Sequence, residues 1–117
     1  MDMRALFEKT AEKLTGKVIF LNFRNPPLLG ALGECYRTAD FLTRIDIVPG
    51  LGIEKTYKIF LHETAHALLH VADYEPTDKA MIASGAVQPH VYTGVWIANK
   101  EKVEAEANAK ALHWATW

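Results

Sequence analysis

The chain has 117 residues, half of them hydrophobic and 23% charged, with a formal net charge of −1. This length predicts one domain, residues 1–117, and the apolar content excludes a disordered chain. Thirteen basic against 14 acidic residues argue against direct nucleic-acid binding. The single cysteine, Cys35, leaves no partner for an intramolecular disulfide or a Cys-based zinc site.

The sequence also argues against a membrane protein. No apolar run approaches the roughly 20 residues of a membrane span. The N-terminus lacks a basic start followed by an apolar stretch, so no signal peptide is predicted. We therefore expect a cytoplasmic protein, in which Cys35 is a small strand residue.

The first half of the chain predicts one helix and three strands. Apolar residues at helical spacing predict a helix over 2–15, which Gly16 ends. The β-rich residues 17–23 predict a strand that ends before two prolines. Two further strands are expected at 34–39 and 43–48, with a link short enough for a hairpin. In the last strand, apolar residues alternate with polar ones, which predicts one wet face.

The second half predicts two long helices around a long loop. The pattern is helical from 53 to 71 and again from 100 to about 114. Between them, prolines and glycines interrupt the chain, with a short helix at 77–83 and a strand or lid-like segment at 91–98 as candidates. The predicted fold class is α+β, with a small three-stranded antiparallel sheet.

The second long helix contains the sequence HETAH at residues 62–66. Residues four apart lie on one helix face, so His62 and His66 can bind one zinc ion through their imidazoles. Glu63 lies beside that face, where a general base can take a proton from a zinc-bound water. This is the H-E-x-x-H pattern of metalloproteases; the alternative is two half-buried histidines beside a solvated glutamate.

A zinc site of this kind needs a third protein ligand and an open fourth position. The last helix offers Glu104, with Glu101 in reserve, and the Asn108 amide can accept a hydrogen bond from a ligand histidine. Glu106 points away from the Glu104 face, and we expect it to be solvated. From composition alone, an exposed face of glutamates and lysines is the better interpretation of this helix.

Two stretches resemble the ImmA/IrrE family of small zinc-peptidase-like domains. Residues 60–70, FLHETAHALLH, resemble the active-site helix of the family, and residues 104–111, EAEANAKA, are similar to its pattern E-x-x-A-N-x-F-A. The likeness covers residues 53–114, and Lys110 stands where the family has Phe. It implies a minimal zincin-like domain in which Glu104 is the third zinc ligand.

The resulting hypothesis is a zinc-dependent peptidase with His62, His66 and Glu104 as ligands and Glu63 as general base. The resemblance implies a protein substrate, such as a repressor of a phage or mobile element. The alternative is a non-catalytic, metal-stabilised interaction module, such as an anti-repressor or a toxin–antitoxin-like partner. Manganese is a weaker alternative to zinc in such a site.

A peptidase also needs a hydrogen-bond donor for the oxyanion of the transition state. Tyr92 is the preferred candidate, ahead of Tyr74, His90 and His113, although packing is the commoner role for each. His70 lies one further turn along the face of His62 and His66. It can orient a ligand or act as a distant ligand, but a capping or half-buried role is the stronger expectation.

Overall fold

The computed structural model describes residues 2–26, 30–37, 42–70 and 100–115. Within these ranges, three helices and one three-stranded sheet form the predicted α+β fold. The elements are α1 (Met3–Thr15), β1 (Ile19–Phe23), β2 (Gly33–Arg37), β3 (Thr43–Ile47), α2 (Ile53–Leu69) and α5 (Lys100–Ala115). The short helix expected at 77–83 and the strand or lid at 91–98 lie outside the described residues.

Helix α1 ends where the sequence predicts, at Thr15, and begins at Met3, one residue later than predicted. The Asp2 carboxylate accepts a hydrogen bond from the Ala5 N–H at 2.7 Å, which caps the first turn. Gly16 ends the helix in the left-handed conformation, with φ of 71°, and donates its N–H to the Glu12 carbonyl. Both signals are local, so they could be identified without knowledge of the fold.

The sheet is mixed, and the prediction of an antiparallel sheet is wrong for one of its two strand pairs. The strand order is β1-β3-β2; β2 and β3 are antiparallel, whereas β1 and β3 are parallel. Strand β3 lies between the other two, because the chain passes from β1 to the far edge before it returns. Alternation of apolar residues reports which face of a strand is buried but not which strand lies beside it.

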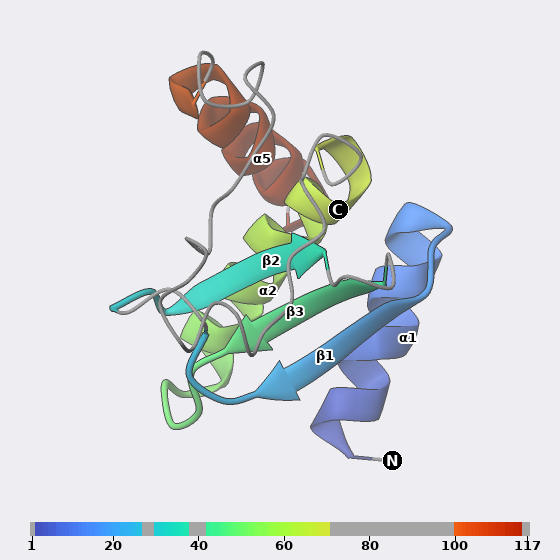
Figure 1. The fold of residues 1–117 in the computed structure, drawn as a ribbon, viewed down its shortest axis with the longest axis vertical. Helices are drawn as coiled ribbons and strands as arrows, with labels where there is room; N and C mark the ends of the chain where they lie inside the picture. Colours follow the sequence, from blue (N-terminus) through green and yellow to red (C-terminus); the bar gives the residue numbers. More distant parts are fainter. Residues whose placement is uncertain (1, 27–29, 38–41, 71–99, 116–117) are drawn as a thin grey trace.

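Helices α1 and α2 cover one face of the sheet, and α5 packs on α2 beyond the β2 edge (Figure 1). Between these layers, the rings of Phe7 and Phe60 stack with centroids 4.6 Å apart. The fully buried side chains of Ile45 and Ile47 come from the central strand. In the described part of the chain, no helix is both long and apolar enough to span a membrane.

The opposite face of the sheet is not uniformly wet, contrary to expectation. Asp46 alternates with Ile45 and Ile47 along β3, yet it is fully buried. Its carboxylate accepts hydrogen bonds from the Arg24 guanidinium at 3.1 Å and the Tyr36 hydroxyl at 2.9 Å. These donors offset the cost of removing the carboxylate from water, so a charged residue can occupy this buried position.

Candidate metal centre on helix α2

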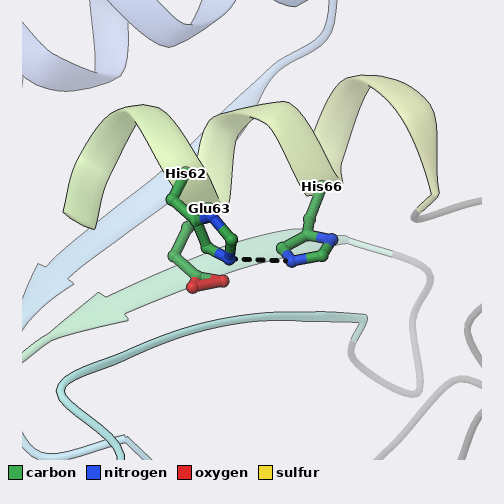
Figure 2. Close-up of side chains that lie close together, drawn as sticks. All are labelled: His62, Glu63 and His66. Atoms are coloured by element: carbon green, nitrogen blue, oxygen red, sulfur yellow. Dashed lines mark hydrogen bonds between the residues drawn. The ribbon is translucent and has the colours of Figure 1, made fainter. Parts of the chain in front are cut away.

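The side chains of His62, Glu63 and His66 project from the same side of helix α2 (Figure 2). The Nε2 atoms of His62 and His66 are 3.1 Å apart, as their spacing of four residues predicts. The potential ligand atoms of all three residues lie within 4.8 Å of one another, a grouping that could hold a metal ion.

Helix α5 brings Glu104 to the same point from about 40 residues further along the chain. Val103 and Ala107 are buried and give α5 a narrow apolar stripe. Glu104 lies beside this stripe, and its carboxylate oxygens are 3.0 Å from Nε2 of His62 and 3.4 Å from Nε2 of His66. Glu101, the reserve candidate one turn earlier, is exposed.

The spacing of these atoms fits a zinc ion. Two ligand atoms that are each about 2.0–2.1 Å from a tetrahedral zinc lie about 3.3 Å from one another. The two Nε2 atoms are 3.1 Å apart, and each lies close to a different oxygen of the Glu104 carboxylate, His62 3.0 Å from Oε2 and His66 3.4 Å from Oε1. Two imidazoles and a carboxylate also form a donor set that zinc commonly takes in catalytic sites.

The charges of the site are set by the two histidines and Glu104. Hydrogen bonds from His62 and His66 hold the pKa of the Glu104 carboxyl well below its usual range, so this group is an anion at neutral pH. The bond to Glu104 in turn raises the pKa of His62, against the opposing effect of burial. An anionic carboxylate facing two imidazole nitrogens is an arrangement that attracts a cation.

Glu63 has a different environment from Glu104. Its side chain is buried against β2, and its carboxylate accepts a hydrogen bond from the Cys35 N–H. Burial raises the pKa of Glu63, while the charges of His66 and His62 act in the opposite direction. A carboxylate whose proton affinity is raised in this way is suited to accept a proton and release it again.

The close contact between α2 and β2 depends on Gly33. A Cβ atom at this position would overlap Cγ2 of Ile59 and would lie 3.5 Å from Cγ of Glu63. The absence of a side chain therefore lets the strand approach the helix closely enough for its backbone to reach Glu63. The sequence alone offered no signal for this role of Gly33.

The other candidates have mixed outcomes. Asn108 hydrogen-bonds His62, as expected of a residue that orients a ligand. His113 is exposed on α5, and Cys35 is buried in β2, where burial raises the pKa of its thiol well above the usual value. The preferred oxyanion donor, Tyr92, lies outside the described residues, as do Tyr74 and His90.

Two residues are more closely tied to the site than the sequence indicated. His70 is buried, and its Nδ1 lies 3.1 Å from Nδ1 of His66. Glu106, expected to point away from the Glu104 face and to be solvated, is exposed and has a carboxylate oxygen 3.5 Å from Nε2 of His70. The prediction for Glu106 is therefore confirmed in both respects, but it did not include the contact with His70.

Comparison with known proteins finds no matching family model, no matching curated protein and no matching solved structure. Membership of the ImmA/IrrE family therefore rests on the two sequence stretches quoted above and stays a prediction. The geometry of His62, Glu63, His66 and Glu104 stands independently of that resemblance.

Proposed function

We propose that this protein is a zinc-dependent peptidase that hydrolyses a peptide bond of a protein substrate. The observation that carries the proposal is the convergence of His62, His66 and Glu104 from two helices, with Glu63 beside them. A structural zinc site is normally closed by four protein ligands, whereas three ligands beside a carboxylate are typical of catalytic sites.

We infer that Glu104, and not Glu63, is the third ligand. The Glu104 carboxylate is held as an anion and lies within 3.4 Å of both Nε2 atoms. The Glu63 carboxylate is instead engaged by the Cys35 N–H, and its raised pKa weakens it as a ligand. The two carboxylates thus divide into one that binds the metal and one that carries protons.

When bound, zinc would supply Lewis acidity that polarises a peptide carbonyl and makes a water molecule a better nucleophile. In this proposal Glu63 accepts the proton of the attacking water and passes it to the leaving amine. The Cys35 N–H keeps the Glu63 carboxylate in place during both transfers. Tyr92 remains the proposed donor to the oxyanion.

The metal site is tested by plasma mass spectrometry on untagged protein purified after saturation with zinc. We expect one zinc per chain in the wild type and a large loss in His62→Ala and Glu104→Ala. Glu101→Ala is the matched control, because this glutamate lies one turn from Glu104 and is exposed. Retention of full zinc by folded Glu104→Ala, or loss in the control, would contradict the ligand assignment.

The activity is tested with Glu63→Gln, which removes the base but keeps the size of the side chain. Wild type and variant are each incubated with a mixture of unfolded proteins of known sequence, and new N-termini are mapped by mass spectrometry. We expect new N-termini with the wild type only, and equal zinc in both proteins.

One observation favours the second candidate, a metal-stabilised interaction module. Glu63 is only 7% exposed, so its bond to the Cys35 N–H can serve packing alone. Zinc-loaded wild type that generates no new N-termini, either from the mixture or from a phage repressor, would establish this alternative over the peptidase.

A further inference from the structure

The buried histidine at the end of α2 has no role in the site described so far. His70 is the C-cap residue of α2, and its backbone N–H donates to the His66 carbonyl at 2.8 Å. Its imidazole is 7% exposed and lies against that of His66, with ring centroids 5.2 Å apart. A buried imidazole costs free energy unless its polar atoms are used, so packing alone is a weak explanation for it.

Metal binding at His66 would determine which of the two rings, His66 or His70, donates the hydrogen bond between them. Nε2 of His66 faces His62 and Glu104, so a metal bound there would need the lone pair of that nitrogen. A neutral His66 then carries its proton on Nδ1, which lies 3.1 Å from Nδ1 of His70. With a metal on Nε2, His66 would donate this hydrogen bond and His70 would accept it, which would leave the proton of His70 on its Nε2.

The second ring nitrogen of His70 is placed consistently with this assignment of protons. The His70 Nε2 lies 3.5 Å from a carboxylate oxygen of Glu106, and a carboxylate favours the tautomer that presents an N–H toward it. Glu104 and Glu106 are about 200° apart around α5. They flank the buried stripe of Val103 and Ala107 on opposite sides, and each faces a different histidine of α2.

We propose that His70 is a positioning residue that fixes the tautomer and ring orientation of His66, with Glu106 supporting it from α5. This proposal rests on the proposed metal site but not on peptidase activity. His70 is not itself a ligand of that site, because it faces the ring nitrogen of His66 that points away from His62 and Glu104. Partners of this kind are typically worth a 10- to 100-fold change in metal affinity.

The first test compares zinc affinities by competition with a chromophoric chelator. We expect His70→Leu to bind zinc about 10- to 100-fold more weakly than the wild type. In His70→Asn the side-chain oxygen can replace Nδ1 as acceptor, so this variant should recover most of the affinity. His113→Leu is the control on an exposed histidine and should bind zinc like the wild type.

Cobalt substitution separates positioning from ligation. The visible spectrum of the cobalt-loaded protein should be the same in wild type and His70→Asn, because the ligands are unchanged. A different spectrum, or zinc affinity in folded His70→Leu within twofold of the wild type, would overturn the proposal.

The imidazole resonances of the zinc-loaded proteins give a readout that does not depend on activity. In the wild type, we expect the proton of His66 on Nδ1, where the hydrogen bond to His70 slows its exchange with water. In His70→Leu the same proton should exchange faster, and equal exchange rates in the two proteins would refute the positioning role. Zinc-loaded wild type with the expected hydrogen bond but no new N-termini would refute the proposed peptidase alone, so the two failures are distinguishable.

Discussion

Substitution of Gly33 by alanine tests whether β2 and α2 are as close as the structure shows. Gly33 is absent from the glycines with positive φ, so its backbone tolerates alanine. Without steric conflict, Gly→Ala would stabilise the protein by about 0.4–1 kcal/mol through the unfolded chain. The added Cβ would overlap Cγ2 of Ile59, however, and overpacking of this kind costs about 1–3 kcal/mol. We therefore expect Gly33→Ala to be destabilising.

The cause can be isolated with Ile59→Ala, which removes the overlapping methyl group. In this background Gly33→Ala should become neutral or stabilising, so that the sign of its effect reverses. The four proteins form a double-mutant cycle, with an expected coupling of about 1–3 kcal/mol between the two positions. Urea unfolding followed by far-UV circular dichroism measures each free energy. Equal costs of Gly33→Ala in both backgrounds would refute the close approach.

Two further predictions concern residues away from the metal centre. Burial and the Asp46 carboxylate raise the pKa of Tyr36 to about 12. An unfolded tyrosine has a pKa of about 10, so the folded state holds the phenol proton more tightly. The resulting contribution to the free energy of unfolding is fully present below pH of about 10 and is lost as the pH rises to about 12. Urea unfolding from pH 9 to 12 should show this loss in the wild type and less of it in Tyr36→Phe; parallel curves would count against it. Gly16→Ala should cost about 1 kcal/mol, although no atom lies within 4 Å of its Cβ, because the left-handed φ alone is unfavourable for alanine. An unchanged urea midpoint would show that the helix end adjusts without strain.

The helices could be predicted because their signals are local. Asp2, Gly16 and the apolar periodicity of α1 act within a few residues, and the H-E-x-x-H spacing has its meaning only on a helix. The order of the strands could not be predicted in this way. The register that places Ile45 beside both Leu21 and Cys35 is decided by contacts across the sheet, and no pattern within one strand encodes it.

The candidate site likewise contains residues that local sequence predicts and residues that it does not. His62, Glu63 and His66 are one helical segment, whereas the match of Glu104 to that segment required the family pattern, because many exposed glutamates share its local surroundings. The placement of Asp46 likewise depended on donors from two other segments, Arg24 and Tyr36, that alternation in β3 cannot reveal.

The contact of Glu106 with His70 was not predicted, and an orienting role for His70 was ranked below a capping role, for a geometric reason. Positions four apart on a helix advance by about 40° around it, so His70 is rotated by about 80° from His62. That rotation carries the third histidine toward the other flank of the α5 stripe, where Glu106 lies. A helix face defined by His62 alone therefore predicts Glu104 and excludes Glu106. Because the three histidines are rotated progressively around α2, His62 and His66 contact Glu104 while His70 contacts Glu106.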